Sequence, residues 1–336
     1  MKKILSVFLC IAVLLGLASC GKSDSETPSV SSKEGSVSDS SDNLSGTNAD
    51  LSTDLSVNTS NETDLVLDSS KADVNSSSSS SANPSGETTS VEAKSTVKVT
   101  IPEGYTLLRI SWLLEEKGLC KSDDFVNAAQ TAKEWLDLNE YYFLKDAFNA
   151  KNVCFYLEGY IFPLTYEIPK NSDAKTILKM LLNGTKNRFT SELVLRAQNS
   201  GHTLHEILTI ASIIEKEART DEQRTMVASV LYNRLKAKMP FQCDVCINYC
   251  EGVIKIAYPN KFTALKEYYN GKNAGMLAGP ICNPGMATIN AAINPAKTDY
   301  LYFIIGKVPP YEAHYSKTYE EHDAFWQANK DRLTGK

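Results

Sequence analysis

The sequence has no excess of positive charge and only one long apolar run. Its 336 residues include 35 Lys and Arg against 40 Asp and Glu, a formal net charge of −5, so the charge does not indicate nucleic acid as a partner. Beyond the first twenty residues, no apolar segment reaches the length of about 20 residues that a bilayer span needs. Apolar residues are also sparse from Gly21 to Val97. The core-forming residues therefore lie in the remaining part, which is long enough to bury a sizeable core.

The single apolar run belongs to a targeting segment. Lys2 and Lys3 precede the run from Ile4 to Leu17, which is too short for a comfortable membrane span. The run ends in L-A-S-C-G, and this resembles a bacterial lipobox, in which the cysteine is lipidated. The pattern predicts a lipoprotein signal peptide over residues 1–20, lipidation at Cys20 and an extracytoplasmic, membrane-anchored protein. An ordinary signal peptide with an incidental cysteine is the alternative.

A serine-rich segment follows over residues 21–95. Ser, Thr, Asn, Asp and Gly dominate it, and Ser76 to Ser81 is an unbroken serine run. Such a composition cannot bury enough apolar surface to offset the entropy of ordering. We therefore predict a disordered linker, whose ~75 residues reach about 50 Å as a flexible coil, enough to hold the folded part away from a lipid surface.

Six cysteines remain once Cys10 and Cys20 are set aside as parts of the signal. They are Cys120, Cys154, Cys243, Cys246, Cys250 and Cys282. An even number in an exported protein permits disulfides, and free buried thiols are the alternative. The spacing of Cys243, Cys246 and Cys250 also resembles three metal ligands, but zinc sites use four and no histidine lies nearby. We predict no metal site and no cofactor.

The folded part shows the patterns of an α+β protein. Alternating β-branched residues predict a strand over residues 95–101, and apolar stripes predict helices over 106–117 and from 122 onward. These elements form a small module over residues 96–155. A mixed α+β domain over 156–332 follows, with an aromatic extended segment at 157–169, a strand at 300–305, and helices over 173–182, 203–218, 220–238, 286–293 and 319–330.

The helix over residues 203–218 carries the most informative pattern. Thr203 and Glu206 form a capping box at its start, and a second capping box, Thr220 with Gln223, begins the next helix. At about 100° per residue, apolar residues cover most of its surface, which predicts a largely buried helix. The polar strip that remains comprises His205, Thr209, Ser212 and Lys216.

Two glutamates, Glu215 and Glu217, end this helix and lie off the polar strip. Desolvation disfavours a carboxylate, and the negative end of the helix dipole acts in the same direction, so we expect a raised pKa. A carboxylic acid that stays protonated near neutral pH is what a general acid needs to protonate a glycosidic oxygen. The alternative is that these side chains reach water or pair with Arg219 or Arg224. The helical pattern does not choose between the two glutamates.

Several short motifs follow one another along about residues 97–330, and their order is informative together with their sequences. The helix end reads A-S-I-I-E-K-E at 211–217, and further segments read M-P-F-Q-C-D at 239–244, G-P-I-C-N-P-G at 279–285, N-P-A-K-T-D-Y-L-Y-F at 294–303, H-Y-S at 314–316 and E-H at 321–322. Upstream, E-G-Y-I-F-P occupies 158–163. Together they resemble the endolytic peptidoglycan transglycosylases, the MltG or YceG-like family.

The resemblance implies a LysM-like module followed by an α+β catalytic domain. It implies non-hydrolytic cleavage between MurNAc and GlcNAc of nascent peptidoglycan strands, leaving 1,6-anhydroMurNAc ends. The family's catalytic glutamate matches Glu217, which acts first as acid and then as base, and Glu215 matches a supporting residue. No second carboxylate nucleophile is required, unlike in most glycosidases. The implied partners are glycan strands, the membrane through the lipid anchor and, as a further candidate, cell-wall synthesis proteins.

The matched polar residues are candidates for holding sugar, with a structural hydrogen bond as the alternative at each position. They are Gln242, Asp244, Tyr269, Asn270, Asn283 and His314. The family's G-L-P-P-G-P is replaced by G-M-L-A-G-P at 275–280, which predicts a looser loop over 269–280 facing the sugar. Three alternative functions remain: a catalytically impaired, peptidoglycan-binding scaffold lipoprotein, a muramidase that hydrolyses the same bond, and a generic solute-binding lipoprotein, against which the E-K-E helix argues.

Overall fold

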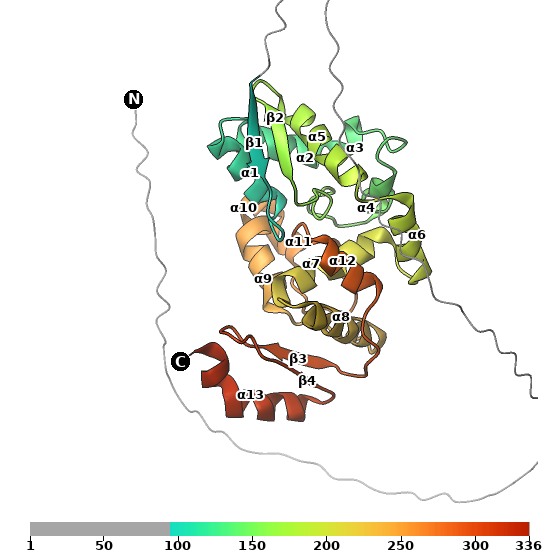
Figure 1. Ribbon diagram of the computed structural model, residues 1–336, viewed down its shortest axis with the longest axis vertical. Coiled ribbons are helices and arrows are strands. Elements are labelled where there is room, and N and C mark those ends of the chain that lie inside the picture. Colours follow the sequence, from blue (N-terminus) through green and yellow to red (C-terminus); the bar gives the residue numbers. More distant parts are fainter. Residues whose placement is uncertain (1–94, 336) are drawn as a thin grey trace, which may run out of the picture. The chain divides into compact units, whose positions relative to one another are not determined.

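The computed structural model describes residues 95–335. The predicted signal peptide, the lipidation site at Cys20 and the predicted linker up to residue 94 lie outside these residues. The described chain mixes helices with two separate two-stranded sheets (Figure 1), which confirms the α+β class. Within residues 95–335, no helix combines the length and apolar character needed to cross a membrane.

The first sheet pairs two strands that are far apart in sequence. β1 runs antiparallel to β2, with Val99 opposite Tyr166. Helices α1 and α2, which come between the two strands in the sequence, pack against each other. β2 follows residue 155, so the sheet joins segments on both sides of the predicted module boundary. The elements of this part are β1 (Thr96–Thr100), α1 (Leu107–Glu116), α2 (Ser122–Gln130), α3 (Ala132–Trp135), η1 (Tyr142–Leu144), α4 (Lys145–Asn149) and β2 (Thr165–Pro169).

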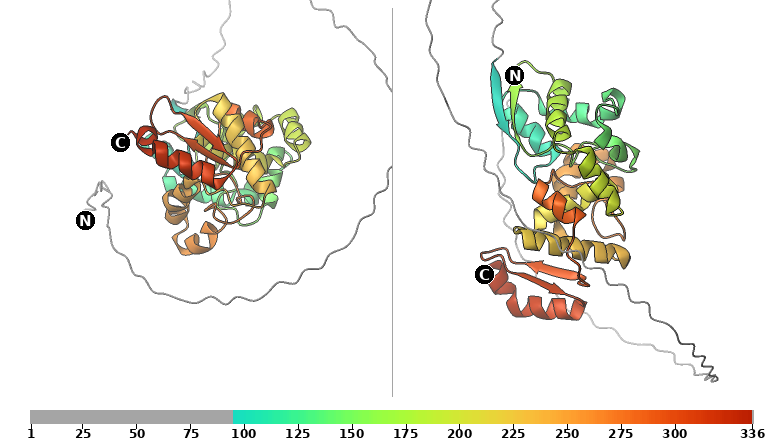
Figure 2. Two further views of the ribbon diagram at one scale, coloured as in Figure 1. Left: turned by 90° about the horizontal axis from the view of Figure 1, so that it is seen from below. Right: turned by 45° about the vertical axis from the view of Figure 1, so that its right-hand side comes forward.

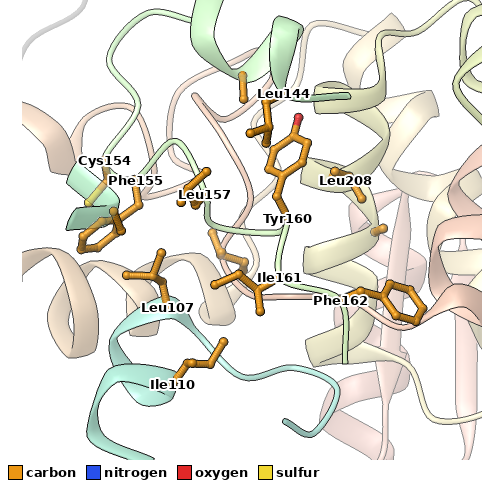
Figure 3. Packing of buried hydrophobic residues seen from close by; sticks show 14 of the residues in the cluster. Leu107, Ile110, Leu144, Cys154, Phe155, Leu157, Tyr160, Ile161, Phe162 and Leu208 are labelled. Atoms are coloured by element: carbon orange, nitrogen blue, oxygen red, sulfur yellow. The ribbon is translucent and has the colours of Figure 1, made fainter. Parts of the chain in front are cut away.

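The segment between α4 and β2 forms the centre of the core. Leu157, Tyr160 and Ile161 are fully buried and lie between α1 and the long helix α7 (Figure 3). Glu158 is buried with them and accepts hydrogen bonds from the Leu107 N–H at 2.9 Å and the Tyr249 hydroxyl at 3.1 Å. Burial raises the pKa of Glu158 to about 8, although both of these donors act to lower it. This aromatic, glycine-punctuated segment is therefore an internal support rather than a surface loop.

Three helices form the scaffold of the second part. α7 packs against both α8 and α12, and the predicted capping boxes of α7 and α8 are present. The remaining elements are α5 (Ala174–Lys186), α6 (Ser191–Asn199), α7 (Leu204–Glu217), α8 (Asp221–Lys236), α9 (Asp244–Tyr249), the π-helix η2 (Cys250–Ile254), α10 (Lys255–Ala257), η3 (Pro259–Lys261), α11 (Phe262–Lys266), α12 (Met286–Ile293), β3 (Tyr302–Ile305), β4 (Ala313–Ser316) and α13 (Tyr319–Thr334).

Helix α7 is buried on nearly every side, including three of the four residues of its polar strip, His205, Thr209 and Ser212. Ser212 accepts a hydrogen bond from the Ile281 N–H at 2.9 Å. His205 lies 3.1 Å from the Tyr160 hydroxyl and 2.9 Å from the Ala278 carbonyl. Only Glu206, Glu215, Lys216 and Glu217 are not buried. The helix therefore presents its chemistry at its C-terminal end.

The C-terminal elements form a hairpin covered by a helix. β3 and β4 are antiparallel, with Ile304 opposite His314. The hairpin lies between α8 and α13 in Figure 1 and in the right view of Figure 2, and both helices contact it. Asn233 on α8 holds the segment that precedes β3, because its side-chain amide donates to the Thr298 and Tyr300 carbonyls, both at 2.9 Å. The predicted strand at 300–305 is confirmed over residues 302–305.

Candidate active site

Glu217, the last residue of α7, lines a cleft of about 1020 Å³. One wall of the cleft comes from the end of α7 and the segment that leads into α9, with Gln242 and Asp244 among its residues. The other wall comes from β3 and α13. The structure thus brings together three of the predicted site residues, Glu217, Gln242 and Asp244.

The surroundings of Glu217 favour its protonated form. Desolvation by burial, followed by the negative charge of Asp244, raises the pKa of Glu217 to about 7, and the positive charge of Lys307 acts in the opposite direction. The side chain still lines the cleft. Glu217 is therefore a half-buried carboxyl group that is available as a proton donor near neutral pH.

The wall opposite Glu217 is aromatic. Tyr302 of β3 lies 5.3 Å from the His322 ring, measured between ring centroids, and Tyr319 and Trp326 of α13 line the same cleft. Within residues 95–335, the buried Nδ1 of His322 has no hydrogen-bond partner. Aromatic faces with a few polar groups between them are typical of sites that hold partly apolar ligands such as sugar rings.

Arg234 fixes the floor between the two walls. It is buried, with 5% of its surface exposed, and donates to the Pro240 carbonyl at 2.8 Å and the Leu301 carbonyl at 2.9 Å. It also donates to the side-chain oxygen of Gln242, a residue whose φ of 55° lies in the left-handed region. Arg234 therefore holds the Gln242 loop against the start of β3, and this restricts how the side chain of Gln242 can meet a ligand.

Glu215 points away from the cleft and supports the neighbouring helix. Its Oε2 accepts hydrogen bonds from the Gly285 N–H at 3.0 Å and the Thr288 hydroxyl at 2.5 Å. Gly285 is the N-cap of α12, so the carboxylate compensates the free N–H groups at that helix start. Lys216 donates to the Gly104 carbonyl at 2.9 Å. Glu215 therefore supports α12, whereas Lys216 and Glu217 both line the cleft.

The predicted sugar contact at Asn283 is corrected by the structure, in which this side chain makes contacts inside the core. It is fully buried, its Oδ1 accepts from the Ile161 N–H at 2.8 Å, and its Nδ2 donates to the Tyr105 carbonyl at 2.9 Å and to Glu158 at 3.2 Å. These bonds use both ends of the amide. Asn283 thus joins the segments on either side of the core and has no polar atom left for a ligand.

Tyr269 and Asn270 are also buried away from the cleft. The Tyr269 hydroxyl accepts from the Cys154 N–H at 3.0 Å, and the Asn270 Oδ1 accepts from the Lys272 N–H at 2.8 Å. No residue of the 269–280 loop, all of which the structure describes, lines the cleft. The loop instead supports the cleft from behind, because the Gly271 carbonyl accepts from the Gln242 N–H at 2.9 Å. The expectation that this loop faces the sugar is corrected accordingly.

His314 lies outside the cleft as well. Its ring stacks on Phe325 with centroids 3.6 Å apart and planes 3° from parallel, and the pair lines a separate hollow of about 550 Å³. The expected sugar contact at His314 is therefore replaced by a packing role between β4 and α13.

The six cysteines of the described part are free thiols. Of the two states that the sequence left open, the structure therefore shows free buried thiols and not disulfides in this part of the chain. Cys243 lines the cleft, and burial raises its pKa well above the usual value. In the described part of the chain, no cluster of three or more His, Cys, Asp or Glu side chains has metal-binding geometry. Cys243 is therefore a neutral wall residue.

Comparison with known proteins decides the relationship. The profile of the YceG-like family matches residues 79–328. The chain belongs to the YceG-like family. An endolytic murein transglycosylase of Bacillus subtilis (strain 168) is 35% identical over 235 residues, which cover 67% of this chain and 63% of that protein. One from Streptococcus pneumoniae serotype 2 is 32% identical over 246 residues, 67% of this chain and 43% of that protein.

A solved structure agrees with this assignment. The crystal structure of a yceG-like protein from Listeria monocytogenes shares 32% identity with a TM-score of 0.58, covering 68% of this chain and 75% of the other. This YceG-like chain spans less than two thirds of the length of the two curated transglycosylases.

Sequence reasoning did not assign several residues that line the cleft of this YceG-like chain. Lys307, Arg234, Tyr319 and Trp326 were absent from the predicted site. Arg234 lies in the segment V-A-S-V-L-Y-N-R-L at 227–235, which also resembles the family, so its position offered a signal. Tyr319 and Trp326 lie on α13, and only the packing of the C-terminal hairpin brings this helix opposite Glu217.

Proposed function

We propose that this protein cleaves the glycosidic bond between MurNAc and GlcNAc in peptidoglycan strands and leaves 1,6-anhydroMurNAc ends. The observation that carries the proposal is Glu217, a carboxyl group with a pKa of about 7 at the end of a buried helix and in a cleft with an aromatic wall. The names of the Bacillus and Streptococcus relatives support the same reaction.

In this mechanism Glu217 acts twice. Its protonated carboxyl first donates to the glycosidic oxygen that leaves as the GlcNAc hydroxyl. The resulting carboxylate then accepts the proton of the MurNAc 6-hydroxyl as that oxygen attacks C1 and closes the anhydro ring. No water is consumed, so the proton returns to Glu217 and the protein is regenerated. Gln242 and the Tyr302–Trp326 wall are the candidate contacts that hold the sugar rings.

Digestion of purified peptidoglycan with the Glu217→Gln variant tests the proposal. Glutamine keeps the size of the side chain but cannot donate a carboxyl proton, so we expect anhydro-muropeptide release to fall by at least about 10²-fold. Glu116→Gln is the matched control, because Glu116 also ends a helix, α1, but is exposed, and it should keep wild-type activity. Intact strands with the wild-type protein, or equal cleavage by Glu217→Gln, would show that the proposal is wrong.

Hydrolysis of the same bond is the second candidate. Asp244 lines the cleft and its charge acts on Glu217, and two carboxyl groups in one cleft are the usual arrangement for glycoside hydrolysis. Mass spectrometry of the digest separates the two reactions, since hydrolysis gives reducing MurNAc ends that are heavier by one water than the anhydro ends.

We infer two further features from the sequence. The antiparallel pairing of β1 with β2 around α1 and α2, with α3, η1 and α4 following α2 in the chain, supports a LysM-like module that grips glycan. The lipobox pattern at Cys20 supports an extracytoplasmic, membrane-anchored protein. Metabolic labelling with a fatty acid analogue, compared between wild type and Cys20→Ser, tests the anchor: loss of label in the variant is the expected result.

A further inference from the structure

His322 lines the cleft, and the fold does not use its imidazole for hydrogen bonding within the described residues. The residue lies in the first turn of α13, where its backbone N–H donates to the Thr318 carbonyl at 3.2 Å. Its ring has two aromatic neighbours, with centroids 5.3 Å away at Tyr302 and 6.3 Å away at Tyr319. Packing therefore fixes the position of the ring while its nitrogens stay free of protein partners.

The two ring nitrogens of His322 differ in their surroundings. Among residues 95–335, Nδ1 is one of the few side-chain atoms that are both shielded from solvent and without a hydrogen-bond partner. Nε2 does not belong to that set, although it also has no partner there, so it is in contact with solvent. Since the side chain lines the cleft, Nε2 is the nitrogen that a ligand in the cleft can reach.

The charge state and the tautomer of His322 follow from these surroundings. Burial, followed by the positive charge of Arg234, lowers the pKa of His322 below its usual value, although the charge of Asp323 acts in the opposite direction. The ring is therefore neutral at pH 7 and carries one proton. On Nε2 this proton has a partner in water or a ligand, whereas on Nδ1 it would be buried without one. His322 thus offers the cleft a neutral hydrogen-bond donor.

A neutral donor beside aromatic rings suits an acetamido group. The carbonyl oxygen of this group accepts a hydrogen bond, and its methyl group packs on an aromatic ring. Both sugars of the proposed substrate carry an acetamido group at C2. A sugar hydroxyl also accepts a hydrogen bond, but it offers no methyl group to the rings of Tyr302 and Tyr319.

We propose that the Nε2–H group of His322 donates to the 2-acetamido carbonyl of a sugar bound against β3 and α13, with the acetyl methyl on the Tyr302 or Tyr319 ring. The inference rests on the proposed function, because this sugar belongs to the glycan that Glu217 cleaves. It makes N-acetylated strands the preferred substrate over strands with free amino groups. A free amine that is protonated is an ammonium, which has no acceptor for the Nε2–H group.

The test compares N-acetylated strands with strands that a deacetylase has converted to free amines. One lost hydrogen bond that leaves its donor unpaired corresponds to about a tenfold lower kcat/KM for the deacetylated strands. His322→Phe keeps a ring beside Tyr302 but removes the donor, so the ratio of the two kcat/KM values should fall close to one. His322→Gln is the matched control, because its amide nitrogen can replace Nε2, and it should keep most of the preference. Thermal unfolding verifies that each variant is folded.

The outcomes separate this inference from the proposed function. Equal cleavage of both substrates by the wild type overturns the acetamido site and leaves the proposed function standing, whereas no cleavage of either substrate overturns both. An unchanged ratio in a folded His322→Phe variant also overturns the site, since the preference would then come from the charge of the free amines. A preference that His322→Phe keeps and His322→Gln loses would assign a packing role to the ring and contradict the proposal.

Binding to His322 can also be measured without catalysis. N,N′-diacetylchitobiose should shift the nitrogen NMR signals of the His322 imidazole in the wild-type protein, whereas the same disaccharide with free amino groups should leave them in place. Unshifted signals with the acetylated sugar, or equal shifts with both sugars, overturn the acetamido site. This measurement decides if His322→Phe does not fold.

Discussion

Replacement of Asp244 by Asn is expected to lower the pKa of Glu217 and to move the alkaline limb of the pH–activity profile to lower pH. The acid form of Glu217 is the active one, so activity is lost as the pH rises through its pKa of about 7. Burial is the larger cause of the rise from 4.5, and the charge of Asp244 is the smaller one. Asp244 therefore supplies the smaller of the two raising contributions, and the limb should move by about one pH unit.

The size of the effect depends strongly on the pH of the assay. At pH 7 about half of the wild-type Glu217 is protonated, whereas a pKa lower by one leaves about one tenth, so the variant should be about fivefold slower there and unaffected near pH 5. Because Asp244 is exposed, added salt should reduce the difference. The position of the limb is the quantity to measure, since a lost sugar contact would lower the rate at every pH.

Lys307→Gln supplies the control of opposite sign. Its positive charge lowers the pKa of Glu217, so its removal should move the same limb to higher pH. The rates are measured as release of soluble muropeptides at constant ionic strength between pH 5 and 9. If the limb stays in place in both variants, or moves in the same direction in both, it does not report the ionisation of Glu217.

Two further variants test the corrected roles of predicted site residues. Asn283→Ala leaves the Ile161 N–H without its partner inside the core, so we expect the free energy of unfolding to fall by at least about 2 kcal/mol; an unchanged urea midpoint would contradict the structural role. Glu215→Ala removes the carboxylate at the start of α12 and should cost about 1 kcal/mol in the same assay. Thr288→Val, which removes one of the two donors to Glu215, should cost less, and a larger loss than for Glu215→Ala would contradict the assignment.

The sequence determined those features that depend on neighbouring residues. The capping boxes at Thr203 and Thr220 place the starts of α7 and α8 correctly, because a cap is formed within one turn of a helix. The position of Glu217 at the end of an apolar helix predicted a raised pKa, and the structure confirms that direction. By contrast, the short helices from α9 to α11 were missed, since none has a side-chain cap hydrogen bond, and β4, with four residues, leaves little pattern.

Only the tertiary structure decided which polar residues meet at the cleft. Asn283 and Tyr269 have the same chemistry as sugar ligands, but their partners Ile161 and Cys154 come from segments far away in the sequence, and a linear pattern does not contain those distances. His205 and Ser212 of the polar strip of α7 are buried for the same reason, because Tyr160, Ala278 and Ile281 supply their partners.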